Sequence, residues 1–248
     1  PIVDTSSATE KQDHSINLTA AQTSVVDAIS SEPGFRAHLL YGVTGSGKTE
    51  VYMELIARTI ARGEQALVLV PEIALTPQLI ERFARRFGDE IAVIHSHLTP
   101  REKTDNWWAV QEGSKKVLIG ARSALFCPLE KLGLIVIDEE HEPSFKQDET
   151  LRYHARDAAV MLAKLRGHPI VLGSATPSLE TWQNAMTNRY RLHRLPTRIH
   201  GVKMPEVEVV DLRESRDLDR QTGRETLIQP SAGEGAVSRP FWLSKELL

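Results

Sequence analysis

The segment between residues 42 and 49 carries the most specific chemical pattern in the chain: Gly42-Val43-Thr44-Gly45-Ser46-Gly47-Lys48-Thr49. Its spacing of glycines, lysine and threonine is that of a loop that binds nucleotide phosphates. Glycines let backbone N–H groups turn toward an anion, and the following helix adds the partial positive charge of its N-terminus. We expect Lys48 to neutralise the β- and γ-phosphates and the Thr49 hydroxyl to ligate Mg²⁺. The expected phosphate contacts are Gly42, Gly45, Ser46, Gly47, Lys48 and Thr49.

An acidic segment, Asp138-Glu139-Glu140-His141, follows the apolar run Leu134–Ile137 directly. A buried strand that ends in aspartate is typical of the second half of such a nucleotide site, where Asp138 holds Mg²⁺ through its water shell. Glu139 would then orient and deprotonate the attacking water. A solvated acidic turn is the alternative, but the glycine-rich loop about 90 residues upstream disfavours it. Together the two segments predict a nucleoside-triphosphate hydrolase site.

Rings and cations alternate just after these carboxylates, a pattern suited to single-stranded nucleic acid because rings stack on bases and cations hold phosphates. A surface loop in which Tyr153 only packs on the domain is the alternative. The residues concerned are Phe145, Lys146, Arg152, Tyr153, His154 and Arg156.

The elements that must position these residues are short apolar runs alternating with helical segments. Each run is too short for a helix and too uniformly apolar for a half-exposed strand, so we expect strands buried on both faces, as in a parallel sheet covered by helices. The alternation predicts a three-layer, doubly wound α/β fold. The predicted strands are Ala37–Tyr41, Ala66–Val70, Ile91–Ile94, Val117–Ile119, Leu134–Ile137 and Ile170–Leu172.

Helix starts and stops are marked between the strands. The segment Thr49–Arg62 places apolar residues on one face, and Gly63 ends it. A threonine followed by proline is an N-cap candidate with proline at the first helical position. Such pairs predict helices after Thr76, Thr99 and Thr176.

Composition bounds the class of protein. The 248 residues include 30 Lys+Arg and 33 Asp+Glu, so any nucleic-acid binding must use a local basic patch. The single cysteine, Cys127, excludes a disulfide framework and a cysteine-based zinc site within this chain. The longest apolar run has six residues, and no secretory signal opens the chain. We expect a cytoplasmic protein with a polar leader at 1–17, one ordered domain at 18–212 and a divergent or truncated tail at 213–248.

Several motifs together resemble a known family. The acidic segment at 138–141 is similar to the DEAH-type box of superfamily 2 helicases, Gly173-Ser174-Ala175-Thr176 to their motif III, and Leu18-Thr19-Ala20-Ala21-Gln22 to their adenine-contacting glutamine motif. With these, Gly42–Glu50, Val70–Thr76, Gly120–Ala124 and Tyr153–Asp157 resemble the bacterial primosomal helicases of replication restart. The resemblance covers about residues 18–212.

The resemblance implies the first RecA-like lobe of a 3′-to-5′ DNA helicase, whose P-loop binds ATP with Mg²⁺. Gln22 would contact adenine, Gly120–Phe126 and the region after Val70 would track the single-stranded backbone, and the segment Phe145–Asp157 would link DNA contact to hydrolysis. For Arg122, a structural ion pair is an equal alternative. The residues expected to couple or sense DNA are Arg122, His141, Phe145, Lys146, Tyr153, Arg156, Ser174 and Thr176.

Partners follow from the same resemblance: single-stranded and forked DNA, other primosome proteins and single-stranded DNA-binding protein, with no membrane. The full-length family also carries zinc, for which this chain has no ligands. Because a second lobe supplies an arginine finger in such motors, we expect this chain alone to bind Mg·ATP with little turnover. Two alternatives stay open. One is another superfamily 2 translocase, of RNA-helicase or restriction type, and the other is a non-catalytic nucleotide-binding module.

Overall fold

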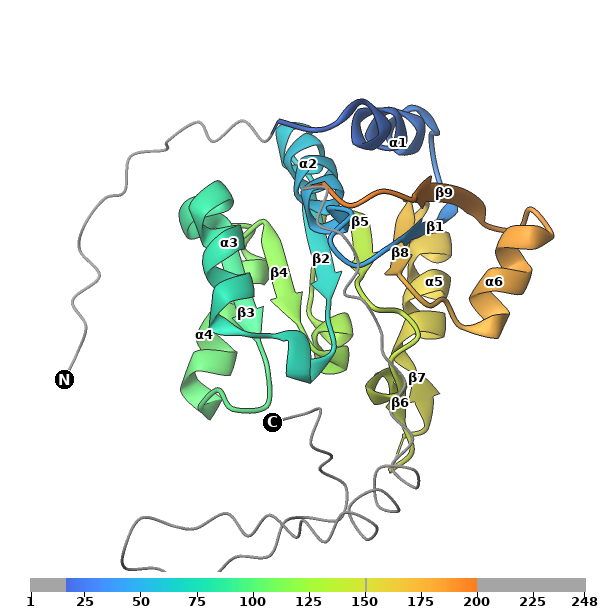
Figure 1. Cartoon of the computed structure of the whole chain (residues 1–248). Helices are drawn as coiled ribbons and strands as arrows, with labels where there is room; N and C mark the ends of the chain where they lie inside the picture. Colours follow the sequence, from blue (N-terminus) through green and yellow to red (C-terminus); the bar gives the residue numbers. More distant parts are fainter. Residues whose placement is uncertain (1–16, 150, 200–248) are drawn as a thin grey trace, which may run out of the picture. The chain divides into compact units, whose positions relative to one another are not determined.

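The computed structural model describes residues 17–149 and 151–199 of the chain (Figure 1). Their centre is a seven-stranded sheet in the order β3-β4-β2-β5-β8-β1-β9, in which every neighbouring pair is parallel. The strands are β1 (Ala37–Gly42), β2 (Gln65–Leu69), β3 (Ile91–Ile94), β4 (Val117–Gly120), β5 (Leu132–Ile137), β8 (Ile170–Ser174) and β9 (Arg191–Leu195).

Helices connect the strands and cover both faces of the sheet, as the sequence predicts (Figure 1). They are α1 (Ala20–Ser31), α2 (Lys48–Ala61), α3 (Pro77–Phe87), α4 (Pro100–Gln111), α5 (Ala155–Arg166) and α6 (Leu179–Met186). Short 3₁₀ turns add η1 (Glu72–Ala74), η2 (Gly88–Glu90), η3 (Arg122–Phe126) and η4 (Pro143–Phe145). A small antiparallel hairpin pairs β6 (Lys146–Gln147) with β7 (Tyr153–His154).

The sheet separates two apolar cores because successive strand residues point to opposite faces. In β2, Ala66 and Val68 pack with α1, α2 and α3, whereas Leu67 and Leu69 pack on the other face with α4, α5 and η3. All four are fully buried, which explains why this strand is apolar throughout instead of alternating. The three-layer prediction is confirmed.

Two of the three predicted Thr-Pro helix starts are confirmed. Thr76 caps α3 through a hydrogen bond from the Leu79 N–H, and Thr99 forms a capping box with Glu102 at the start of α4. The third is wrong: α6 begins at Leu179, and its N-cap is Ser178 instead of Thr176. The Thr176 N–H donates instead to the Ser174 hydroxyl at 2.9 Å, which holds the chain in a turn before the helix can start.

The sequence analysis missed β9, which has no continuous apolar run. The strand reads Arg-Leu-His-Arg-Leu and lies at the sheet edge beside β1. Its His193 Nε2 lies 3.1 Å from Nδ1 of the fully buried His38, and burial lowers the pKa of His38 to about 3. Parallel pairing with β1, more than residue type, stabilises this strand.

The predicted leader at 1–17 and tail at 213–248 lie outside the described residues, apart from residue 17. Within the described part of the chain, every helix is too short or too polar to cross a membrane.

Candidate nucleotide-binding site

The glycine-rich loop joins β1 to α2 and is shaped by left-handed backbone. Gly45 and Gly47 both have φ of 79°, a conformation that strains residues with a Cβ atom. Gly47 is the N-cap of α2, so the helix N-terminus points its free N–H groups into the loop. The Lys48 ammonium group, from a side chain 9% exposed, donates to the Gly42 carbonyl at 3.1 Å. The loop therefore holds its cation in place without a ligand.

Gln22 braces this loop from α1. Its side-chain amide donates to the carbonyls of Ser46 and Gly47 at 3.2 and 3.3 Å, and its Oε1 accepts from the Thr19 N–H. Gln22 is 1% exposed. The structure thus places Gln22 at the loop, and its adenine contact stays a prediction.

A cavity of about 340 Å³ opens over the loop at the carboxyl ends of the strands. Side chains of opposite charge line its walls. Lys48 faces Asp138 and Glu139, and Arg82 of α3 pairs with Glu50 of α2. The cavity is lined by Val43, Thr44, Gly45, Ser46, Gly47, Lys48, Thr49, Glu50, Arg82, Asp138, Glu139 and Ile199. The two predicted halves of the site therefore share one cavity.

Asp138 follows β5 directly and is held by a tyrosine that the sequence patterns did not indicate. The Tyr52 hydroxyl donates to Asp138 Oδ1 at 3.0 Å. Burial and the adjacent Glu139 raise the pKa of Asp138, against the opposing effects of Tyr52 and Lys48. Burial and the Asp138 charge raise the pKa of Tyr52 well above its usual value, so the phenol stays a donor. Tyr52 lies one helical turn after Lys48, a spacing that could have revealed it.

These residues suit a nucleotide-bound Mg²⁺. A hard cation prefers oxygen ligands such as the Asp138 carboxylate and the Thr49 hydroxyl. The raised pKa of Asp138 reports a buried carboxylate whose charge the protein compensates only in part. The Ser46 hydroxyl is buried without a hydrogen-bond partner in the same loop. An unsatisfied hydroxyl on one side of the cavity and a buried carboxylate on the other are consistent with a charged, oxygen-rich ligand.

Glu139 lies over the cavity in an unusual backbone conformation. Its φ is 47°, the left-handed region that residues with a Cβ rarely adopt. Its carboxylate lies 3.7 Å from Lys48 Nζ and 3.6 Å from His141 Nδ1, and its side chain is 37% exposed. The carboxylate lies near the Lys48 ammonium group and the His141 ring without being saturated by hydrogen bonds, so it stays open to a water in the cavity.

Glu140 is fully buried and saturated, although it follows Glu139 directly. Its carboxylate accepts hydrogen bonds from Arg156 Nη1 at 3.1 Å, from the Ser178 N–H and hydroxyl, and from the Thr181 hydroxyl at 2.8 Å. This buried network ties the acidic turn to the starts of α5 and α6. The sequence analysis quoted Glu140 in its motif but gave it no role.

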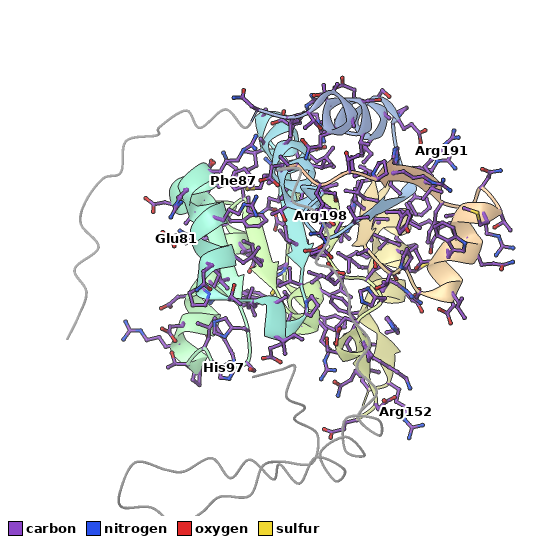
Figure 2. The ribbon with its side chains drawn as sticks, viewed as in Figure 1. Glu81, Phe87, His97, Arg152, Arg191 and Arg198 are labelled. Carbon is purple, nitrogen blue, oxygen red and sulfur yellow. The ribbon has the colours of Figure 1, made fainter. Side chains whose placement is uncertain are left out.

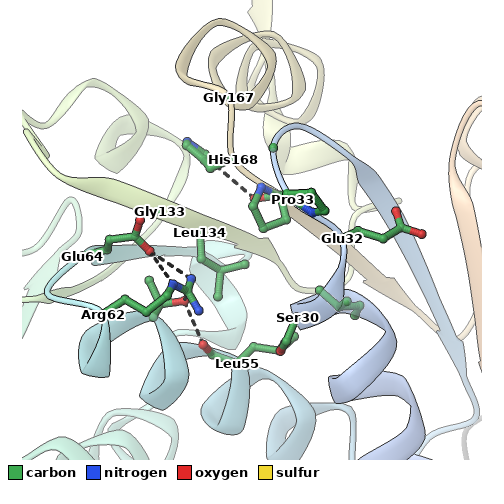
Figure 3. A pocket seen from close by; sticks show the side chains of 14 residues that line it. Ser30, Glu32, Pro33, Leu55, Arg62, Glu64, Gly133, Leu134, Gly167 and His168 are labelled. Carbon is green, nitrogen blue, oxygen red and sulfur yellow. Dashed lines mark hydrogen bonds and ion pairs between the residues drawn. The ribbon is translucent and has the colours of Figure 1, made fainter.

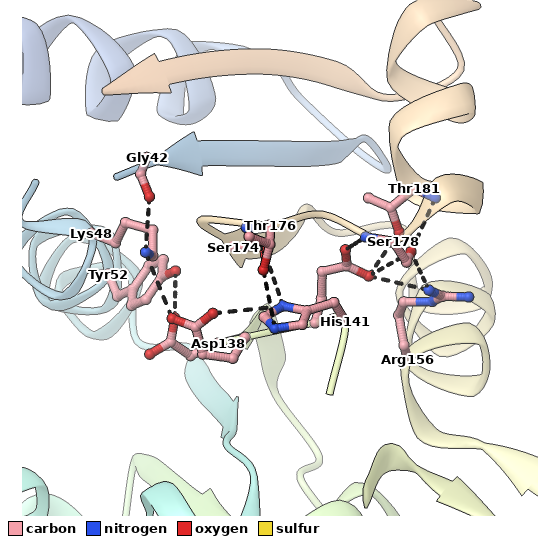
Figure 4. A network of polar contacts seen from close by, with 12 residues as sticks. Gly42, Lys48, Tyr52, Asp138, His141, Arg156, Ser174, Thr176, Ser178 and Thr181 are labelled. Atoms are coloured by element: carbon pink, nitrogen blue, oxygen red, sulfur yellow. Dashed lines mark hydrogen bonds and ion pairs between the residues drawn. The ribbon is translucent and has the colours of Figure 1, made fainter. Parts of the chain in front are cut away.

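His141 connects the acidic turn to the end of β8 (Figure 4). Its Nδ1 lies 2.8 Å from the Ser174 hydroxyl, and its Nε2 lies 3.3 Å from the Thr176 hydroxyl. Three predicted coupling residues are therefore in one contact chain that begins at Glu139.

The basic and aromatic segment lies at the β6–β7 hairpin, away from the nucleotide cavity (Figure 1). Arg122 donates to the backbone carbonyls of Ser144 and Lys146 at 3.2 and 2.8 Å. It therefore clamps the chain that leads into the hairpin, instead of forming the side-chain ion pair considered as an alternative. The position of Arg122 links β4, which precedes it, to the segment after the acidic turn.

Two members of that segment are buried, which argues against direct contact with nucleic acid, whereas their role in coupling stays a prediction. Phe145 is 1% exposed and packs in the apolar core, so its ring is not available to stack on a base. Arg156 is 8% exposed and bonds Glu140, Asp157 and Ser178, so its guanidinium is not offered to a phosphate. In both cases core formation outweighs the pattern of rings and cations.

The other members lie nearer the surface. The half-buried Tyr153 ring contacts the Phe126 ring edge-on, with centroids 5.2 Å apart. Lys146 is exposed and pairs with Asp148, and Arg152 lies at the outer end of the hairpin (Figure 2). Their contact with DNA stays a prediction.

A second cavity, of about 210 Å³, lies at the opposite, amino-terminal end of the strands (Figure 3). Its lining includes the ion pair of Arg62 and Glu64 and the buried His168, whose Nδ1 faces the Pro169 carbonyl at 3.0 Å. Ligands of open parallel α/β sheets bind at the carboxyl ends of the strands, which favours the first cavity as the nucleotide site.

Comparison with known proteins agrees with this geometry. A model of the DEAD/DEAH box helicase family matches residues 19–185. The chain is 50% identical to the replication restart protein PriA of Bacillus subtilis (strain 168) over 179 residues, which are 72% of this chain and 22% of that protein. It is 44% identical to the PriA protein of Chlamydia pneumoniae over 208 residues, which are 82% of this chain and 28% of that protein. The chain thus spans about a quarter of the length of these relatives.

Solved helicases share the fold. The structure of RecG bound to a three-way DNA junction matches 84% of this chain and 28% of its own, with a TM-score of 0.52 and 23% identity. The DUF1998 helicase MrfA bound to DNA matches 73% of this chain and 26% of its own, with a TM-score of 0.52 and 17% identity. At these identities the likeness concerns the fold alone.

Proposed function

Because this chain belongs to the DEAD/DEAH box helicase family, we propose that it is the ATP-binding lobe of a 3′-to-5′ DNA helicase that acts in replication restart and primosome assembly at stalled forks. One observation carries the nucleotide half of the proposal. Lys48 from the glycine-rich loop and Asp138 and Glu139 from β5 meet in one cavity over a helix N-terminus. The PriA relatives support the replication half.

ATP binding would use preformed charge. The N–H groups at the start of α2 and the Lys48 ammonium group would hold the β- and γ-phosphates. Thr49 and Asp138 would hold Mg²⁺, which neutralises phosphate charge when bound. Tyr52 fixes the orientation of Asp138 through its hydrogen bond, so the carboxylate is aimed before the metal arrives.

Hydrolysis would use Glu139 as the base. Its carboxylate is part-exposed, so it can reach a water in the cavity and take its proton as the water oxygen bonds to the γ-phosphorus. The bond between that phosphorus and the β–γ bridging oxygen breaks in the same step, and ADP leaves with the electron pair. Lys48, 3.7 Å away, then stabilises the charge that develops on the phosphate oxygens. His141 would report the state of Glu139 to Ser174 and Thr176 through its two ring nitrogens.

Contact with DNA would influence the carboxylates of the acidic turn through the segment that joins this turn to the β6–β7 hairpin. Arg122 clamps the segment before the β6–β7 hairpin, and Arg156, just after the hairpin, bonds the neighbour of Glu139. Strand binding at Lys146 or Tyr153 would therefore shift a segment tied at both ends to the acidic turn. We infer single-stranded and forked DNA as substrates, other primosome proteins and single-stranded DNA-binding protein as partners, and the cytoplasm as the location.

The test is ATP binding and hydrolysis by this chain with and without forked DNA. We expect wild type to bind Mg·ATP, to turn it over slowly, and to lose about 100-fold in affinity on Lys48→Ala, because a nearly buried cation is removed from the phosphates. Arg101→Ala, which changes an exposed cation on α4, is the matched control and should bind normally.

The outcomes separate the alternatives. Stimulation by forked DNA but not by RNA supports the proposal, and the reverse would indicate an RNA helicase. Equal stimulation by unforked duplex DNA would indicate a restriction-type translocase. Binding that depends on Lys48, with no turnover under any condition, would indicate a non-catalytic nucleotide-binding module. Absence of binding would refute the nucleotide site itself.

A further inference from the structure

The segment that follows β9 returns to the phosphate loop and is pinned along it. The Val43 N–H donates to the Leu195 carbonyl at 3.3 Å, and the Ile199 N–H donates to the Gly45 carbonyl at 3.1 Å. Residues 195–199 therefore run beside the loop from its first turn to its glycine-rich centre. Arg198, labelled in Figure 2, lies within this stretch. No motif in the sequence pointed to it.

The Ile199 side chain lies over Gly47 and lines the nucleotide cavity. A Cβ atom built on Gly47 would lie 2.3 Å from Ile199 Cδ1 and equally 2.3 Å from Gln22 Nε2. Ile199 and Gln22 thus converge on the same glycine from two distant parts of the chain. Ile199 is nevertheless 39% exposed, so one side of its side chain is covered by the loop and the other is open.

The cavity is lined by two kinds of side chain, polar or charged and apolar. Lys48, Thr49, Arg82, Asp138 and Glu139 offer charge and hydrogen bonds, which suit phosphates and a metal ion. Ile199 is the largest apolar side chain in the lining. A nucleotide needs both kinds of surface, because its phosphates are charged and its base has flat, weakly hydrated faces.

Resting on the function proposed above, we propose that Ile199 forms the apolar wall against which the base of the bound nucleotide rests. Gln22 lies at the same place, but its amide already bonds the loop carbonyls and Thr19. Ile199 therefore supplies contact area, whereas discrimination between bases falls to polar groups. Residue 199 follows β9 closely, so the pairing of β9 with β1 and the Ile199–Gly45 hydrogen bond together position the wall.

The test separates the base from the phosphates. Isothermal titration of the full 248-residue chain in Mg²⁺ compares ATP with inorganic tripolyphosphate, which has phosphates but no base. Ile199→Ala should weaken ATP about fivefold through lost apolar burial and leave tripolyphosphate unchanged. Ile199→Leu, which keeps the apolar volume, should bind ATP like wild type. GTP should lose as much as ATP on Ile199→Ala, since an apolar wall does not read base identity.

Four results would overturn the inference. Equal weakening of ATP and tripolyphosphate would mean that Ile199 only shapes the loop. Unchanged or tighter ATP binding in Ile199→Ala would mean that the side chain is a bystander or blocks the cavity. A wild-type chain that binds neither probe would refute the nucleotide site and this inference together, whereas binding lost on Lys48→Ala but indifferent to Ile199 would refute the inference alone.

Discussion

Two adjacent carboxylates, Glu139 and Glu140, follow the same strand and lie in opposite surroundings. The Glu139 side chain is 37% exposed and has Lys48 and His141 nearby at 3.6–3.7 Å. Glu140 is fully buried and accepts hydrogen bonds from Arg156, Ser178 and Thr181. Adjacent positions thus hold one carboxylate that solvent can reach and one that hydrogen bonds saturate.

The two carboxylates of the turn have different roles: Glu140 holds the turn in place, and Glu139 stays accessible to water. The left-handed φ of Glu139 places successive side chains in different environments. Saturation of Glu140 anchors the turn to α5 and α6, and that anchor allows Glu139 to remain unsaturated where a water can reach it. The strained backbone of Glu139 persists because the hydrogen bonds of Glu140 fix the rest of the turn. Substitutions at the two positions should therefore affect different properties.

The largest expected effect is on turnover at Glu139. Glu139→Gln keeps the shape of the side chain but removes the base, so we expect hydrolysis to fall about 10²- to 10⁴-fold with ATP affinity within a few-fold of wild type. Single-turnover hydrolysis and equilibrium binding measure the two quantities. Normal ATP hydrolysis by Glu139→Gln would contradict the role of Glu139 as the base, and with it the functional difference from Glu140.

Glu140→Ala should instead unfold the lobe more easily. It removes the buried carboxylate that pairs with Arg156, which keeps only the exposed Asp157 carboxylate and the Ser178 hydroxyl, so we expect a loss of about 3–5 kcal/mol of unfolding free energy. Urea unfolding followed by circular dichroism measures it. The matched control is Asp148→Ala, whose ion pair with Lys146 is exposed and is worth less than about 1 kcal/mol. Equal losses in both variants would contradict the role of the anchor.

Thr181→Val dissects the same network at one bond. Removing a hydroxyl donor from a buried carboxylate should cost about 1.5–3 kcal/mol, with volume nearly conserved. Thr187→Val, which removes a hydroxyl bonded to the Gln183 carbonyl at the helix end, should stay within about 0.5 kcal/mol. If Thr181→Val is as mild as its control, Glu140 is not saturated in solution.

Asp138→Asn should give the smallest effect and the opposite sign. Because burial raises the pKa of Asp138, ionising it costs the folded state stability as pH rises from the ordinary aspartate range to the raised value. The asparagine variant escapes that cost, so it should be slightly more stable than wild type at neutral pH, while losing Mg²⁺-dependent ATP binding. Thermal melts from pH 4 to 8 should show a gap that opens with pH and then levels off. A gap that closes as pH rises would contradict the pKa direction.

Most of the fold could be predicted because the parallel sheet is buried on both faces. The runs at Ala66–Val70 and Leu134–Ile137 are apolar throughout, and both are strands. β9 could not be predicted, since pairing with β1 stabilises a strand that carries two arginines and a histidine. Thr176-Pro177 satisfied a local rule for helix starts, but the hydrogen bond to Ser174 overrides it.

The candidate site, like the fold, could be predicted only in part. Its loop and acidic turn follow from the spacing of charged residues and glycines within short segments. Tyr52 was missed because its contact with Asp138 depends on its place one helical turn after Lys48. Ile199 was missed because it follows β9, a strand that the sequence does not predict. Direct contact of Phe145 and Arg156 with nucleic acid could not be judged from the sequence, because burial, which decides whether a ring or a cation is available, depends on distant packing.

β9 also ends the sheet, and its outer side meets no further strand among the described residues. An unpaired strand edge is a template on which another chain can add a strand and begin to aggregate. Arg191 and Arg194 are exposed along this edge. The positive charges that hid β9 from sequence-based prediction therefore protect the lobe from intermolecular strand pairing, at the edge next to the strand that leads into the phosphate loop.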